Sequence, residues 1–383
     1  MSEETILRLV DLIYKAAGDA SRWPTVVHRL AEALNGTAST LHGHQIPSQE
    51  SHFSADWNVD PRAVTEYTEY FGYRNIWRFF RPNLLQTGSV RVTQELCPKE
   101  VFVKSEYYQD YLRRYDLFHA VAVTLRRDGR DFSNLTIFRP RGALMFDEAE
   151  RRLLVILAPH LVRAFELHSR IQGLENKANV LEDTLDRQTA AIVLLDSRGM
   201  VVFRNKSARS LFESQKDLRI TRDEIQASNP SEHKKLTRLI RGAACTGAGV
   251  SSHPGGAVTI SRNAFKRPLH VLVSPLRTDA LRLGHTSPAA VLFITDPEEE
   301  PLLPEEWLQQ LYGLTPAESR LALLLAAGNA PKEAAQQLQV GISTVRSQLK
   351  SIFAKTDTNR QSELVRLLLM SPAQTLRGSV KPL

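Results

Sequence analysis

The chain has 383 residues, of which 42% are hydrophobic and 24% are charged, and its net charge is +7 at pH 7. This length predicts roughly two to four domains of about 100 to 200 residues each. No apolar run approaches the roughly 18 residues of a membrane span, and the two cysteines match no zinc or redox spacing. We therefore expect a cytoplasmic protein without a membrane partner. The positive charge permits nucleic-acid binding but does not establish it.

Residues 1–146 predict an α+β sensor domain. Apolar residues recur at helical spacing twice between residues 3 and 35. Short alternating runs typical of strands follow near residues 37–46, 88–93, 119–126 and 132–139. Helical stretches separate them, one of them a helix near residues 105–114. By this order, and by the closing ILAPHLVRAFELHSRI, the segment resembles the GAF-like input domains of bacterial regulators.

Residues 147–188 predict one long helix with a heptad pattern. Its seam residues alternate spacings of four and three: Leu153, Leu157, His160, Ala164, Leu167, Ile171, Leu174, Ala178, Leu181 and Leu185. Two interpretations stay open. The seam joins two copies in a parallel homodimer, with dimer contacts from Leu167, Ile171, Leu174 and Leu181, or the stripe packs on the protein's own domains.

Residues 189–296 predict a second sensor domain. The stretch AIVLLDSRGMVVFRN, 191–205, predicts two strands around a tight turn, and a helix follows. A second helix, 231–244, precedes three strands near residues 257–262, 269–276 and 290–295. Two strands, helices and three strands is an order that resembles a PAS domain. The acidic, proline-bearing residues 297–306 are expected to form a linker.

Seven aromatic residues lie close together in the first domain: Tyr67, Tyr70, Phe71, Tyr73, Trp77, Phe79 and Phe80. They form either ordinary core or the lining of a ligand cavity, and both interpretations stay open. The autoinducer-binding module of quorum regulators has a similar composition here but a different spacing. The chain contains no Gly-rich phosphate loop, nucleophile elbow or convincing metal-ligand cluster. We expect no catalytic residue, no cofactor and no metal site.

Residues 307–371 predict a small all-helical domain, followed by a tail at 372–383. Thr315 is expected to cap a helix that has Pro316 at its first position and Glu318 three residues after the cap. That helix should stop near residue 328. A short helix at 331–338, a tight turn and a helix capped by Ser343 then form a helix-turn-helix.

The helix that follows the turn is amphipathic. Val345, Leu349, Ile352 and Phe353 share one face, which predicts that they are buried. The outward face is cationic or hydroxylated, and residues 341–356 contain no carboxylate. A helix fits the major groove of B-DNA, which is roughly 12 Å wide, and arginine and lysine can donate to guanine there. The outward residues are Thr344, Arg346, Ser347, Lys350 and Ser351.

The stretch LTPAESRLALLLAAGNAPKEAAQQLQVGISTVRSQLKSIFAKTDTNRQSELVRLL resembles the LuxR-type DNA-binding domain along its full length. The resemblance implies a recognition helix at 343–354, in which Arg346, Ser347 and Lys350 read bases. It assigns phosphate contacts to Lys332, Thr344 and Lys355, and it includes Ser343 in the DNA-binding set. The helix at 361–369 would correspond to the family's dimerisation helix, with Leu364, Val365 and Leu368 as contacts.

Together these features predict a multidomain α+β protein. GAF-like and PAS-like antiparallel-sheet sensor domains are joined by a long helix and followed by an all-α, four-helix helix-turn-helix domain. The predicted function is that of a homodimeric, sequence-specific transcription regulator that binds double-stranded DNA and responds to a signal. Whether a sensor domain binds a small molecule stays open. In a competing interpretation, a ligand-binding or catalytic GAF/PAS protein uses its C-terminal helices only for protein contacts.

Overall fold

The computed structural model describes residues 3–45, 51–128, 131–250, 252–262, 266–276, 287–298 and 304–370. Half of the predicted linker, residues 299–303, and the predicted tail at 372–383 lie outside them. The chain divides into two compact units, Met1–Lys177 and Ala178–Leu383. Both units combine helices with antiparallel sheet, which agrees with the predicted multidomain α+β class. No helix in the described ranges is long and apolar enough to cross a membrane.

The first unit contains one five-stranded sheet and the helices around it. Its strands are β1 (Ala38–Gln45), β2 (Ser51–Trp57), β3 (Val90–Val92), β4 (His119–Asp128) and β5 (Asp131–Arg139). Its α-helices are α1 (Glu3–Ala17), α2 (Trp23–Ala33), α3 (Pro61–Glu69), α4 (Ile76–Phe79), α5 (Thr93–Leu96), α6 (Lys99–Phe102) and the start of α7 (Glu148–Asp186). Short 3-10 or π turns are η1 (Ala20–Arg22), η2 (Phe71–Tyr73), η3 (Pro82–Leu84), η4 (Tyr107–Tyr111) and η5 (Leu112–Tyr115).

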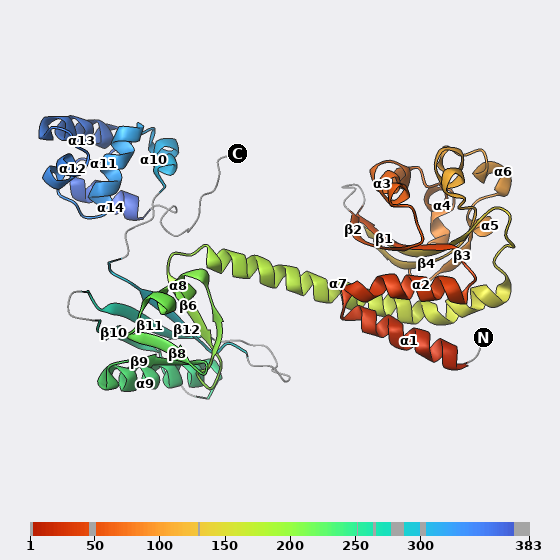
Figure 1. The fold of residues 1–383 in the computed structure, drawn as a ribbon, viewed down its shortest axis with the longest axis horizontal. Helices are drawn as coiled ribbons and strands as arrows, with labels where there is room; N and C mark the ends of the chain where they lie inside the picture. The colour runs from red at the N-terminus through yellow and green to blue at the C-terminus, as the bar shows by residue number, and fades with distance from the viewer. Residues whose placement is uncertain are drawn as a thin grey trace. The chain divides into compact units, whose positions relative to one another are not determined.

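The sheet of this unit has the order β2-β1-β5-β4-β3 and carries a core on each face. Helices α1 and α2 and the first half of α7 cover one face, and the segments from α3 to η5 cover the other (Figure 1). Alternation along the strands divides the residues between the two cores: Val121 and Val123 belong to the first, and Ala120 to the second. The face under α3 to η5 holds the cavity described below.

In this unit the sequence analysis missed one strand, and one predicted helix has a different helix type. β2 pairs with β1 at the edge of the sheet, although the sequence analysis assigned no strand there. Its sequence, SHFSADW, is mostly polar and lacks the β-branched residues that mark a strand. The helix predicted near residues 105–114 is present, but as a π-helix followed by a 3-10 helix, η4 and η5, and not as an α-helix.

The long helix α7 was predicted at 147–188 and spans Glu148–Asp186. Its stripe divides into two parts. Leu153, Leu157 and Ala164 are buried against the first core, so the interpretation of packing on the protein's own domain holds for them. Farther along, Leu174 is 66% exposed and Leu181 is 64% exposed.

The second unit begins with the end of α7 and contains another five-stranded sheet, in the order β10-β11-β12-β6-β7. Its strands are β6 (Ala191–Leu195), β7 (Val201–Arg204), β10 (Gly256–Ile260), β11 (Leu269–Pro275) and β12 (Ala290–Thr295). Helices α8 (Lys206–Ser214) and α9 (Pro230–Gly247) pack on its buried face. The hairpin of β8 (Leu218–Thr221) and β9 (Glu224–Ala227) was not predicted.

The C-terminal part is all helical and contains α10 (Glu305–Tyr312), α11 (Pro316–Ala326), α12 (Pro331–Gln337), α13 (Ile342–Thr356) and α14 (Gln361–Leu369). Four helices were predicted, and α10 is a fifth. It begins at Glu305, inside the predicted linker, with Pro304 at its N-cap. Its Leu308 is fully buried in the same core as the other four helices.

The predicted capping box of α11 is present. The Thr315 hydroxyl accepts from the Glu318 backbone N–H at 3.3 Å, and the Glu318 carboxylate accepts from the Thr315 N–H at 2.7 Å. The predicted cap at Ser343 is wrong, since the N-cap of α13 is Gly341 and the helix begins at Ile342. Ser343 therefore lies in the first turn, where its side chain is exposed.

Candidate DNA-binding surface and sensor cavity

Helix α13 has one buried side and one exposed side. Val345 and Ile352 are fully buried in the core of the C-terminal helices, and Leu349 and Phe353 pack partly buried against it. These contacts fix the rotation of the helix about its axis. The opposite side is therefore directed to solvent as the amphipathic pattern predicts.

The exposed side of α13 is cationic. Arg346 and Lys350 are exposed, and within the described ranges no hydrogen bond or ion pair holds their charged groups. Lys332 on α12 is exposed as well. The hydroxylated residues Ser343, Thr344 and Ser347 are also exposed. These six predicted residues of α12 and α13 are thus all accessible to solvent.

Two residues assigned to that surface have a different environment. The Ser351 hydroxyl donates to Glu318 Oε1 at 2.6 Å, and Lys355 Nζ donates to Glu318 Oε2 at 2.7 Å. Ser351 thus faces the interior rather than the outside. Lys355 is one-third exposed and is neutralised by a carboxylate of its own domain, which weakens its assignment to a phosphate.

Glu318 is the centre of this arrangement and is almost buried, with 8% of its side chain exposed. Burial raises the pKa of its carboxyl, but the hydrogen bonds from Lys355, Ser351 and Thr315 outweigh burial and lower that pKa to about 2. The carboxylate stays ionised at neutral pH and links α11 to α13. The pattern at residues 315–318 predicted the cap but not the contact with α13.

The predicted dimerisation residues of α14 require a correction. Leu364 and Leu368 are fully buried in the core of their own domain, so they are not available to a second copy in this structure. Val365 packs partly buried against the same core. On α7, by contrast, Leu174 and Leu181 are exposed, Leu167 is 42% exposed and Ile171 is half-buried.

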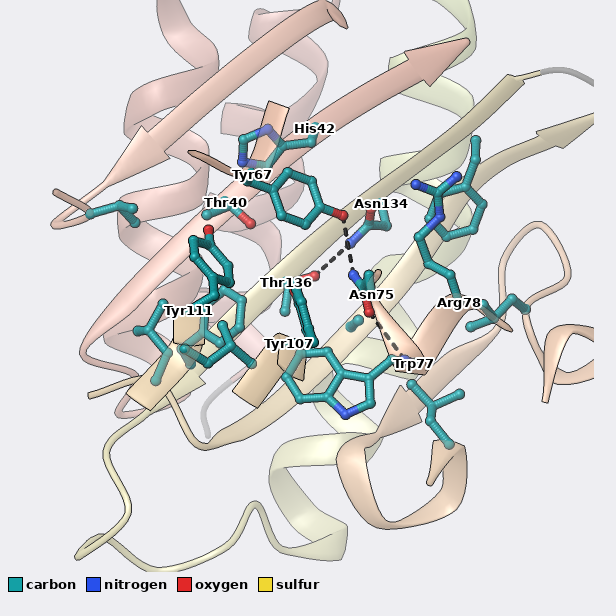
Figure 2. Close-up of a pocket in the computed structure, with 18 of the residues that line it drawn as sticks. Thr40, His42, Tyr67, Asn75, Trp77, Arg78, Tyr107, Tyr111, Asn134 and Thr136 are labelled. Carbon is teal, nitrogen blue, oxygen red and sulfur yellow. Dashed lines mark hydrogen bonds between the residues drawn. The ribbon is translucent and has the colours of Figure 1, made fainter. Parts of the chain in front are cut away.

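The first unit contains a cavity of about 60 Å³ between the sheet and the segments α3 to η5. Roughly 10–15 Å³ on this measure holds one water molecule, so the space exceeds a single hydration site. Its walls are mainly apolar and aromatic, as in small-molecule sites. Figure 2 shows the following residues around it: Thr40, His42, Tyr67, Asn75, Trp77, Arg78, Tyr107, Tyr111, Asn134 and Thr136.

Hydrogen bonds within the wall fix its polar side chains. Asn75 Nδ2 donates to the Tyr67 hydroxyl at 3.1 Å, and Asn75 Oδ1 accepts from the Trp77 backbone N–H at 3.1 Å (Figure 2). The Tyr111 hydroxyl donates to the Ala63 carbonyl at 3.0 Å. Burial raises the pKa of Tyr107 and of Tyr111, so both phenols stay neutral.

The seven aromatic residues of the sequence cluster do not all have the same role: some line the cavity, one belongs to the core, and the others are exposed. Tyr67 and Trp77 line the cavity, and Phe71 belongs to the surrounding core. The others are exposed: Tyr70, Tyr73, Phe79 and Phe80. The sequence analysis missed the wall residues on η4 and β5, which lie far along the chain and carried no local signal. These are Tyr107, Tyr111, Phe132 and Phe138.

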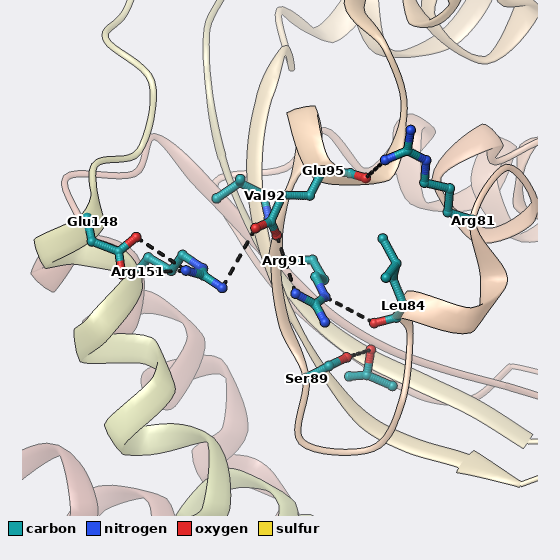
Figure 3. A network of polar contacts seen from close by, with 9 residues as sticks. Arg81, Leu84, Ser89, Arg91, Val92, Glu95, Glu148 and Arg151 are labelled. Carbon is teal, nitrogen blue, oxygen red and sulfur yellow. Dashed lines mark hydrogen bonds and ion pairs between the residues drawn. The ribbon is translucent and has the colours of Figure 1, made fainter.

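A polar network connects one wall of the cavity to α7 (Figure 3). Arg151 of α7 lies 3.7 Å from Glu95 of α5, and Arg91 of β3 lies 3.8 Å from the same carboxylate. Arg91 also donates to the Leu84 carbonyl at 3.1 Å. The residues next to these anchor points, Leu85 and Leu96, line the cavity.

The described residues contain no group of three His, Cys, Asp or Glu side chains placed to hold a metal ion. The Nε2 of His42, on β1, lies 3.0 Å from Asp56 Oδ1. Cys97 and Cys245 are free.

No family model matches this chain, and no curated protein matches it. Among solved structures, it is similar to the ligand-binding domain of VqsR from Pseudomonas aeruginosa, with 14% identity over 44% of this chain and 95% of that one, at a TM-score of 0.35. It is also similar to the N-acylhomoserine lactone dependent LuxR family transcription factor CepR2 from Burkholderia cenocepacia, with 14% identity over 44% of this chain and 98% of that one, at a TM-score of 0.33. With SdiA from Escherichia coli it shares 10% identity over 90% of this chain and 88% of that one, at a TM-score of 0.28. Similarities this low do not show the function of this chain.

Proposed function

We propose that this chain is a dimeric, signal-responsive transcription regulator that reads duplex DNA with α13. The observation that carries the proposal is the exposed cationic side of a helix whose apolar side is locked in a core. At 15 residues, α13 is about 22 Å long, which suits the major groove. Arg346, Ser347 and Lys350 then contact base edges, while Lys332 and Thr344 contact phosphates.

The two sheets support the proposed sensor assignments. Numbered by their order within each sheet domain, both follow 2-1-5-4-3, the first as β2-β1-β5-β4-β3 and the second as β7-β6-β12-β11-β10. We assign the first to a GAF-like domain, 1–146, and the second to a PAS-like domain, 189–296. The cavity makes the first domain the candidate receiver of a small-molecule signal.

The exposed second half of α7 is the proposed dimer seam. Leu167, Ile171, Leu174 and Leu181 follow the heptad spacing and are accessible to a second copy. A signal that changes the packing of α7 on the first domain would shift the population of states in which two helix-turn-helix domains lie about one helical turn, roughly 34 Å, apart.

A selection of DNA sequences from a random pool, followed by a gel shift of the enriched site, tests the proposal. The double substitution Arg346→Ala with Lys350→Ala should abolish the shift while the helical circular dichroism stays unchanged. The matched control Arg320→Ala removes an exposed arginine of α11 that faces Glu305 and should retain the shift. Absence of any enriched or non-specifically bound DNA would favour a domain that makes only protein contacts.

A further inference from the structure

The cavity wall contains one charged group without a protein counter-charge. Among the described residues that line the cavity there is no Asp or Glu, whereas Arg78 is present and half-buried. The other basic wall residue, His42, is paired with Asp56. No ion pair to Arg78 occurs within the described ranges, where the neighbouring arginine, Arg74, pairs with Glu106 at 3.2 Å.

The position of the Arg78 guanidinium leaves much of its donor capacity free. Nη1 donates to the Gly72 carbonyl at 3.1 Å. A guanidinium has five N–H groups, and among the described residues no other acceptor is hydrogen-bonded to them. The guanidinium also lies 4.8 Å from the centre of the Phe132 ring on the facing strand. Asn134 of the same strand also lines the cavity, and Figure 2 labels Arg78 and Asn134. The planar fork is thus held in place but is not saturated.

A half-buried cation without a counter-charge is costly, and a bound anion would remove that cost. Arg78 also acts on another wall residue, Tyr107. Burial raises the pKa of the Tyr107 phenol, and the positive charge of Arg78 opposes part of that rise. A guanidinium fork matches a planar carboxylate with two parallel hydrogen bonds. Phosphate is a poorer fit, because its higher charge would enter a largely apolar wall with a single permanent cation.

We propose that the cavity binds a small amphipathic carboxylate, with its carboxylate on Arg78 and its apolar body between Tyr67, Trp77 and Tyr111. This inference rests on the proposed role of the cavity as the signal site. It adds that the signal is an anion rather than a neutral molecule. The limited volume favours a single aromatic ring or a medium-length aliphatic chain over a larger body.

The test uses calorimetric titration of the full chain with two acids, phenylacetate and octanoate, and with their neutral amides, phenylacetamide and octanamide. The apolar body is constant within each pair, so the difference isolates the carboxylate. At pH 7 at least one acid should bind about tenfold or more tightly than its amide, as expected for a charge-assisted pair that is partly shielded from water.

Arg78→Met keeps the length and apolar packing of the side chain but removes the fork. It should abolish the preference for the acid and leave the affinity of the amide nearly unchanged. Arg78→Lys keeps a charge without the fork and should retain part of the preference, which covers the case in which methionine disturbs folding. Arg74→Met, outside the cavity wall, should behave as the wild type.

Equal affinity for acids and amides, an acid preference that survives Arg78→Met, or no binding of either acid would overturn the proposal. These outcomes are separate from the DNA-binding test. Arg346→Ala with Lys350→Ala should bind the acids as the wild type does, and a failure of the DNA gel shift would leave the titration readable.

Discussion

The stability of the C-terminal helices should depend on one carboxylate. Glu318 receives hydrogen bonds from Lys355, Ser351 and Thr315, which together lower the pKa of its carboxyl from 4.5 to about 2. At about 1.4 kcal/mol per pH unit, this difference corresponds to roughly 3 kcal/mol of stability at pH 7. Solvent around the one-third exposed Lys355 screens part of it, so we expect Glu318→Gln to cost about 2 kcal/mol.

The pH dependence has a defined sign. A carboxyl with a lowered pKa stabilises the folded state fully above its unfolded pKa, near 4.5, and this contribution is lost as pH falls through the folded pKa, about 2. The difference between wild type and Glu318→Gln should therefore be largest at pH 7. At pH 3 less than half of it should remain.

Hydrogen exchange of peptides from α11 and α13, followed over a urea series, measures this difference in the full chain. The control Glu333→Gln removes a carboxylate that, among the described residues, accepts from one backbone N–H at the start of α12, that of Ala330 at 2.7 Å. It should cost no more than about 1 kcal/mol. If Glu318→Gln has the same effect at pH 3 and pH 7, or no larger effect than Glu333→Gln, the carboxylate is not the link described here.

Three further outcomes are expected. In a cysteine-free background, Leu174→Cys and Leu181→Cys should each form an intermolecular disulfide on non-reducing electrophoresis, whereas Lys177→Cys, which lies off the seam, should not. Equal crosslinking at all three positions would show that these residues do not form a dimer seam. Lys332→Ala should lower the slope of log affinity against log salt by about one, and an unchanged slope would exclude its phosphate contact. Arg139→Met should lower the stability of the first unit by about 3 kcal/mol in urea unfolding, because it removes the counter-charge of Glu150, whose side chain is 16% exposed and keeps only its hydrogen bonds with Asp147 and Asn35 among the described residues. A loss under about 1 kcal/mol, the size expected for a surface ion pair, would refute this.

Local signals explain what the sequence analysis predicted well. The capping box at Thr315 and the apolar spacing from Val345 to Ile352 need only neighbours within one or two turns, and both agree with the structure. Helix α7 was placed within two residues at each end, since its heptad pattern is long. Such features are set by residues close in sequence.

The errors concern tertiary packing. Apolar spacing in α14 cannot tell a core face from a dimer face, and Leu364 and Leu368 proved to be core. Ser351 lies beside the outward residues of α13 in sequence, but a carboxylate from α11 draws its hydroxyl inward. The cavity escaped prediction for the same reason, because its walls come from residues as far apart as Thr40 and Phe138.

The network between the cavity wall and α7 offers a last test of how a signal could reach the long helix. Arg151 and Arg152 are neighbours on α7 and both contact Glu148, but only Arg151 also reaches Glu95 on α5. Arg151 is 28% exposed and Arg152 is 76% exposed, so the first pair is the better shielded.

Arg151→Met should therefore loosen the segment from β3 to α5, residues 90–96, while Arg152→Met should leave it unchanged. A pair of this exposure contributes up to about 1 kcal/mol, which corresponds to hydrogen exchange up to about fivefold faster in peptides that cover the segment. Exchange that rises equally in both variants would reflect a general loss of charge on α7. Exchange that rises in neither would mean that the wall holding Leu85 and Leu96 does not depend on α7, and a ligand in the cavity would then need another route to the helix.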